Sequence, residues 1–110
     1  MINAEQFNSA ADILGAERAE QYLRGALQGI PPLLEAVRLK LRLDSEDLEG
    51  LHHHLNTLAA LGAHVLADQV ASIETLLREK RPVDEGALTS AVAIHASTST
   101  AFVELTGQTL

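Results

Sequence analysis

The apolar residues of this chain recur in steps of three and four, the spacing that aligns side chains along one face of an α-helix. Leucine and alanine are strong helix formers and make up 36 of the 110 residues, whereas only three residues are aromatic. Strands favour β-branched and aromatic residues, so the composition agrees with the helical spacing. We therefore predict an all-α fold. The longest apolar stripe consists of Leu23, Leu27, Ile30, Leu34, Val37 and Leu41.

Capping residues, glycines and prolines divide the chain into five helical segments. Asn3 and Gly15 fit the start and end of the first segment, and the acidic run from Asp44 to Asp47 fits the start of the third. The Pro31-Pro32 pair interrupts the second segment, but its apolar stripe stays in phase. We therefore expect one kinked helix or two abutting helices there. The expected helices cover about residues 2–14, 16–41, 44–62, 63–80 and 84–105.

The last segment has the weakest stripe, because Ser97-Thr98-Ser99-Thr100 interrupts it with side chains that compete for backbone hydrogen bonds. Four main helices with short connections nevertheless predict an up-and-down four-helix bundle with a short extra N-terminal helix. We expect this bundle to form one domain over residues 1–110.

Composition removes several classes of function. The chain has no cysteine, which excludes disulfides, thiolate zinc sites and cysteine nucleophiles. Its net charge of −7 and its three aromatic residues oppose nucleic-acid binding. It has neither a membrane-spanning apolar run nor the basic start and apolar core of a signal peptide. We expect a cytoplasmic protein, and the initial Met without a long linker favours a free-standing one.

Three of the five histidines are consecutive, in Leu51-His52-His53-His54-Leu55. Metal ligands on one helix need a spacing of three or four residues to share a face, whereas consecutive side chains point about 100° apart. No histidine or acid follows any of the three at that spacing, and Glu49 upstream offers only a weak two-ligand site. We therefore expect no metal site and no cofactor in this chain.

A helical wheel separates the three histidines by exposure. Measured from the leucine stripe, His54 lies about 60° away and is half covered, His52 lies about 100° away on the flank, and His53 lies about 160° away in water. An exposed imidazole is largely neutral at pH 7 and has one nitrogen free as a nucleophile. Exposed histidines are also common without any function, so geometry alone does not assign one.

The histidine segment and its surroundings resemble the histidine-containing phosphotransfer (HPt) domain of two-component phosphorelays. That family has a motif close to His-x-Leu-Lys-Gly-Ser-x-x-x-x-Gly-Ala, to which the segment from His53 to Ala63 is similar. Downstream, Leu66-x-x-x-Val70-x-x-Ile73-Glu74 is similar to the family's Leu-x-x-x-Cys-x-x-Leu-Glu. Upstream, the segment from Ile30 to Val37 resembles the family's Leu-Pro-x-Leu-Leu-x-x-Leu. The resemblance covers about residues 3–105.

Three departures from the family pattern bear on the site. Asn56 stands where the family has a lysine that helps to hold the phosphoryl group, and Thr57 stands where it has a glycine that leaves room for the partner. The distance from His53 to Gly62 is one residue short. Starting the motif at His52 restores this distance but displaces the buried leucine. We therefore expect phosphorylation on His53, with His52 as the second choice.

The resemblance implies a phosphoryl carrier rather than a self-sufficient catalyst. A receiver domain or a hybrid sensor kinase would be the partner, and Mg²⁺ would belong to the receiver. Asn56, Thr57 and Ala60 are the residues expected to contact the phosphoryl group or the partner. A monomeric protein suffices for this role. The alternative is an HPt-like protein that has lost phosphotransfer and acts by binding a kinase or receiver, as the changes at Asn56 and Thr57 suggest.

Overall fold

The computed structural model describes residues 1–110 and contains five α-helices and no strand. This confirms the predicted all-α fold. Each boundary lies within a few residues of the predicted one, and the largest difference is at the end of the second helix. The helices are α1 (Ala4–Leu14), α2 (Ala16–Arg38), α3 (Ser45–Ala60), α4 (His64–Arg78) and α5 (Glu85–Thr106). None of them combines the length and the apolar character that a bilayer-crossing helix needs.

Short polar side chains cap the helix starts at the predicted places. Asn3 accepts a hydrogen bond from the Gln6 amide at the start of α1. Asp44 and Asp47 form a reciprocal capping box at the start of α3, in which each side chain accepts from the other residue's backbone amide. At the start of α5, the Asp84 side chain accepts a single hydrogen bond from the Ala87 amide. These caps satisfy amide donors that have no partner within the helix.

Helix α2 continues across both prolines as one element. Pro31 has no amide hydrogen, so the carbonyl of Leu27, four residues earlier, loses its usual helical donor. His95 of α5 replaces that donor, because its Nε2 lies 2.6 Å from the Leu27 oxygen. The expectation that the apolar stripe reaches Leu41 is wrong, since α2 ends at Arg38 and Leu41 is exposed in the following loop.

Helix α5 also continues through its polar run. The hydroxyls of Thr98 and Thr100 donate to the carbonyls of Ile94 and Ala96, four residues earlier in each case. Their hydrogen bonds therefore stay within the helix rather than breaking it. Thr98 is fully buried and faces the core together with Phe102.

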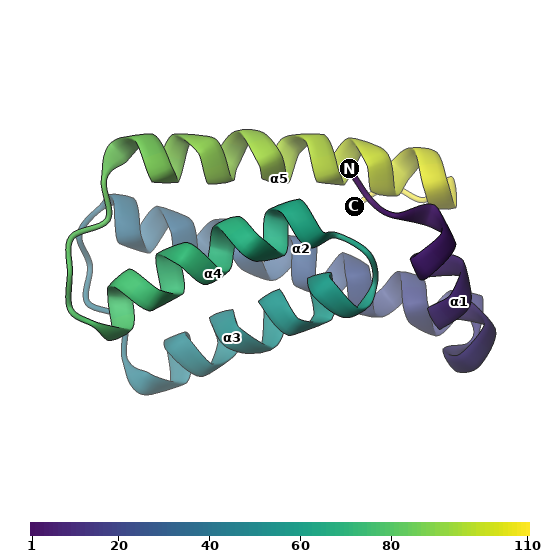
Figure 1. Ribbon diagram of the computed structural model, residues 1–110, viewed down its shortest axis with the longest axis horizontal. Helices are drawn as coiled ribbons and strands as arrows, with labels where there is room; N and C mark the ends of the chain where they lie inside the picture. Colours follow the sequence, from purple (N-terminus) through teal and green to yellow (C-terminus); the bar gives the residue numbers. More distant parts are fainter.

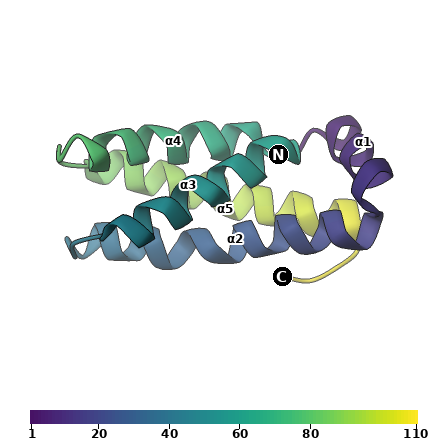
Figure 2. The ribbon, with the colours of Figure 1, turned by 90° about the horizontal axis from the view of Figure 1, so that it is seen from below.

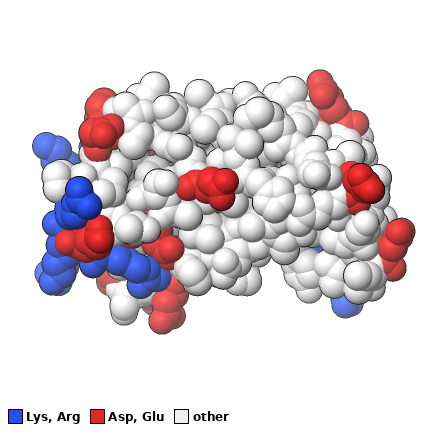
Figure 3. Space-filling view, in the orientation of Figure 1, with Lys and Arg blue, Asp and Glu red and all other residues white.

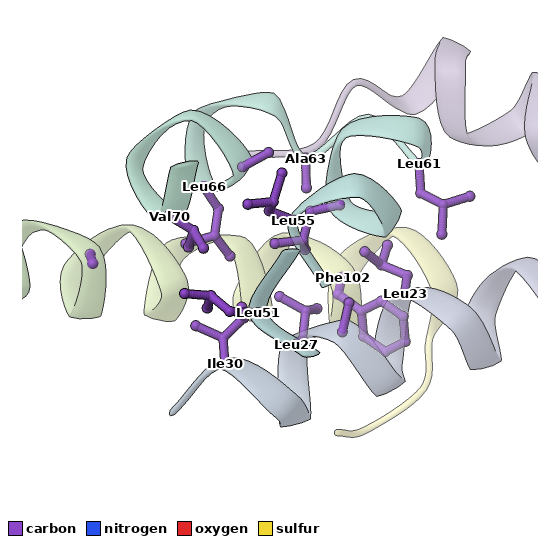
Figure 4. Close-up of a cluster of buried hydrophobic side chains, with 14 of the residues drawn as sticks. Leu23, Leu27, Ile30, Leu51, Leu55, Leu61, Ala63, Leu66, Val70 and Phe102 are labelled. Carbon is purple, nitrogen blue, oxygen red and sulfur yellow. The ribbon is translucent and has the colours of Figure 1, made fainter. Parts of the chain in front are cut away.

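Helices α2 to α5 pack in a closed cycle in which α2 contacts α3, α3 contacts α4, α4 contacts α5, and α5 contacts α2. Figures 1 and 2 show these four helices running lengthwise while α1 crosses one end. A cluster of 19 buried apolar side chains fills the space between them. Figure 4 shows members of this cluster from α2, α3, α4 and α5 converging on one another.

Helix α1 is tied to the turn between α3 and α4. The Asn3 amide donates to the carbonyl of Gly62 over 2.9 Å. The Gln6 side chain donates to the carbonyls of Ala59 and Ala60, and its oxygen is bonded to Nε2 of His64. Gly62 has φ +93°, and a Cβ there would lie 2.7 Å from the Asn3 oxygen. This glycine therefore permits both the turn and the close approach of α1.

The loops α2–α3 and α4–α5 use the same turn, 40 positions apart. In each, a lysine adopts a left-handed conformation just after the helix: Lys40 with φ 59° and Lys80 with φ 57°. The amides of Leu41 and Arg81 then donate to carbonyls five residues earlier, as in a Schellman motif. Each loop ends at the capping aspartate of the next helix, Asp44 or Asp84. This repeated hairpin turn was not predicted from the sequence.

Candidate functional site

The three consecutive histidines of α3 face three different surroundings. His52 and His53 are exposed, while His54 is half-buried. This agrees with the prediction from the leucine stripe that His54 is the most covered of the three. Leu51 and Leu55, which flank the three histidines, are both buried and fix the rotation of the helix.

His52 is held from the neighbouring helix by Glu74 of α4. Nδ1 of His52 lies 3.1 Å from Oε2 and 3.2 Å from Oε1 of Glu74. The Glu74 side chain is only 10% exposed, whereas that of His52 is 54% exposed. A carboxylate accepts hydrogen bonds, so Nδ1 carries the hydrogen and the imidazole is oriented with Nε2 as its remaining nitrogen. The structure gives Nε2 no hydrogen-bond partner within the protein.

Arg78, one turn after Glu74 on α4, completes this group. Its guanidinium donates to Oε2 of Glu74 over 3.0 Å and lies 3.5 Å from the Leu48 carbonyl of α3. The buried carboxylate therefore has a charged partner as well as the imidazole, which offsets the cost of removing it from water. We call His52, Glu74 and Arg78 the His52 triad.

His54 fills the seam between α3 and α2. A Cβ added to Gly29 would lie 2.2 Å from Nε2 of His54, so only glycine leaves room for the ring at this position of α2. Burial lowers the pKa of His54 below its ordinary value, and the neighbouring His53 lowers it further. His54 is therefore a neutral packing residue at pH 7.

His53 lies at a groove between α2 and α3 with a volume of about 470 Å³. Thr57 and Ala60, two of the residues expected to contact a partner, also line this groove. Asn56 is exposed but lies outside it. The Thr57 hydroxyl donates to the His53 carbonyl over 3.1 Å, so it is occupied within the helix. The α2 wall of the groove is formed by Gln21, Tyr22, Gly25 and Ala26.

The remaining two histidines bind backbone or side-chain partners between helices. His64 is bonded to Gln6 of α1, and His95 is bonded to the Leu27 carbonyl of α2. Both belong to packing contacts between helices. No three histidine or acidic side chains lie close enough together to hold a metal ion.

Sequence reasoning missed the role of Glu74 and considered Glu49 instead. Glu74 lies 22 residues after His52 on another helix, so no local spacing connects them. The sequence did contain one indication that Glu74 is buried. Glu74 follows Val70 by four residues and precedes Leu77 by three, which places an acid at a position of the buried stripe of α4. A buried acid needs a partner, and His52 and Arg78 supply two.

Comparisons with protein-family models, with curated proteins and with solved structures found no match. The HPt resemblance therefore depends on the motif residues of this chain alone.

Proposed function

We propose that this protein is a cytoplasmic phosphoryl carrier, with Nε2 of His52 as the acceptor, built on an up-and-down four-helix bundle of the HPt type. The observation that carries the proposal is the Glu74 carboxylate on Nδ1 of His52, which orients the ring of this exposed side chain and leaves Nε2 as its free nitrogen. His53 is also exposed, but no side chain orients its ring through a hydrogen bond. The geometry therefore favours His52 over the motif-based choice of His53.

In the proposed phosphoryl transfer, this chain contributes the imidazole of His52 and the carboxylate of Glu74. The lone pair of Nε2 attacks the phosphorus of an aspartyl phosphate on a receiver domain, so an N–P bond forms and the acyl P–O bond breaks. The electron pair of the broken bond stays on the receiver's carboxylate. The imidazole keeps its Nδ1 hydrogen and becomes a cation, which the Glu74 carboxylate stabilises. The receiver supplies Mg²⁺.

Two side chains near His52 are suited to the phosphoryl oxygens. Asn56 lies one turn after His52 on the same helix face and has a neutral amide donor. Arg78 is bound to the same carboxylate as His52, and its side chain is 47% exposed, so it can supply positive charge beside the ring. With the motif started at His52, Leu55 stands at the family's lysine position, so Asn56 and Arg78 would take over the role of that lysine from other positions.

A second candidate function is binding of a kinase or receiver without phosphotransfer. The groove beside His53 favours it, because Thr57 adds bulk where the family has glycine and no lysine or arginine lines the groove. In this case the exposed imidazoles would be contact residues only.

Phosphorylation assays on matched variants test the proposal. The protein is incubated with a panel of receiver domains phosphorylated by acetyl phosphate in Mg²⁺, and separately with phosphoramidate, which phosphorylates histidine directly. We expect acid-labile label on the wild type and on His53→Gln, and none on His52→Gln. Glu74→Gln should be labelled about tenfold more slowly, because the orienting carboxylate is lost.

Circular dichroism of each variant confirms that a loss of label does not reflect unfolding. Label that is lost in His53→Gln and kept in His52→Gln would return the assignment to His53. A wild type that accepts label from phosphoramidate but from no receiver, while binding one of them, would establish the binding function instead.

A further inference from the structure

Charge is strongly segregated along the molecule. The two hairpin loops, residues 38–44 and 78–84, contain six of the eight lysines and arginines but only three of the fifteen acids. The rest of the chain has two cations and twelve acids. Both loops lie at the same end of the bundle, where lysines and arginines gather in Figure 3. We call this the basic end.

Half of the cations at the basic end have no carboxylate partner. Arg38, Arg78 and Arg81 form ion pairs with Glu35, Glu74 and Glu79, respectively. The hydrogen bonds from Arg38 also lower the pKa of Glu35. The other three cations are exposed and form no ion pair: Lys40, Arg42 and Lys80.

Apolar side chains accompany these three cations. Leu39 and Leu41, which alternate with the basic residues of the first loop, are 53% and 59% exposed. Leu41 and Leu77 line two adjoining hollows of about 640 and 350 Å³. Arg42 and Lys80 border the first hollow, and Lys40 borders the second. The basic end therefore presents partly apolar hollows that are bordered by both paired and unpaired cations, with Glu85 as the one acid in their lining.

The backbone at two lysines of the basic end is strained. Lys40 and Lys80 both occupy a left-handed position where glycine is the usual residue and where a side chain costs about 1 kcal/mol. Attraction to the negative helix end offsets part of that cost. The chain nevertheless keeps a lysine at both strained positions, which places the two ammonium groups beside the hollows.

We propose that the basic end is a docking site for an acidic segment of a partner protein that carries an apolar side chain between its carboxylates. The carboxylates would pair with Lys40, Arg42 and Lys80, and the apolar side chain would enter the hollows beside Leu41 and Leu77. A flat anionic bilayer fits less well, because its headgroups would reach the exposed cations but would place no apolar side chain in the hollows beside Leu41 and Leu77. This site is separate from the histidine face and does not depend on the proposed phosphotransfer.

Peptide binding to glycine variants tests this docking site. The probe is a fluorescein-labelled peptide of about 12 residues in which glutamates surround two leucines, and its binding is followed by fluorescence anisotropy. The double variant Lys40→Gly/Lys80→Gly removes two charges and relieves two strained positions. We expect it to bind the peptide about tenfold more weakly while melting at the same or a higher temperature. The melting temperature therefore distinguishes binding that is lost through unfolding from binding that is lost because the two charges are removed.

A matched pair of single variants controls for total charge. Arg42→Gln should weaken binding about threefold, whereas Arg18→Gln at the opposite end should leave it unchanged. The same peptide with lysine in place of glutamate should not bind.

Two outcomes would overturn the proposal. One is equal binding of the peptide by the wild type and the double glycine variant, and the other is equal weakening by the two arginine variants. Tighter binding to vesicles of phosphatidylserine than to the peptide would assign the site to a membrane instead.

Discussion

The hairpins α2–α3 and α4–α5 share a turn but use their histidines differently. In the second helix of each hairpin, one imidazole is bonded to a neighbouring helix: His52 of α3 to Glu74, and His95 of α5 to the Leu27 carbonyl. His52 is bonded through Nδ1, and its side chain is largely in water. His95 is bonded through Nε2 within the α2–α5 seam and is half-buried. The partner and the bonded nitrogen decide whether an imidazole is available for chemistry or occupied by packing.

The largest expected difference between these two histidines is in stability. His95→Ala leaves the Leu27 carbonyl without a donor in the seam and should lower the free energy of unfolding by about 2 kcal/mol. His52→Ala should lower it by only about 0.5 kcal/mol, because its ring is largely exposed and Glu74 keeps Arg78. Urea unfolding followed by circular dichroism measures both.

Pro31 provides the control for this prediction. In Pro31→Ala, the new amide can donate to the Leu27 carbonyl as in a regular helix. His95→Ala should then cost about 1 kcal/mol less in the Pro31→Ala background than in the wild type. An unchanged cost would mean that His95 contributes through ring packing rather than through the carbonyl.

The sequence predicted the helices well, because apolar spacing and capping residues are local signals. Asn3, Asp44 and Asp84 mark helix starts without any knowledge of the fold. The leucines beside His52 and His54 also predicted that His54 is the most covered histidine of the three. The end of α2 was missed because Leu41 continues the stripe in phase, whereas the left-handed Lys40 has already ended the helix.

The hydrogen-bond partners of the histidines could not be predicted from the sequence. Glu74 and Leu27 meet His52 and His95 only because neighbouring helices pack in a particular register, and sequence separations of 22 and 68 residues show no periodic relation. The room for His54 depends in the same way on Gly29, which reads from sequence only as a weak point in a helix. A bundle can thus be predicted from local patterns before its side-chain pairs can.

The turn shared by the two hairpins predicts a smaller effect. Lys40→Gly and Lys80→Gly should each raise the free energy of unfolding by about 0.5 kcal/mol, because glycine adopts the left-handed conformation without strain. Thermal melts of the two single variants and of the double variant measure this. Equal gains would support the equivalence of the two turns, and a gain in only one would show that the hairpins differ in strain.

The smallest expected effect is a pH dependence that comes from His54, the third kind of histidine in the α2–α3 hairpin. Its pKa is lowered in the folded protein, so between that value and the ordinary one near 6.5 the unfolded chain binds more protons than the folded chain. The contribution of His54 to stability is therefore complete above about pH 6.5 and falls as the pH is lowered through this window. His54→Gln, which stays neutral, should show a flatter decrease in melting temperature between about pH 7.5 and 5.5 than the wild type.

Parallel curves for the two proteins would show that the ring next to Gly29 accepts a proton as readily when folded as when unfolded. The seam would then be open enough for water to reach His54, which would make it resemble His52 more than His95.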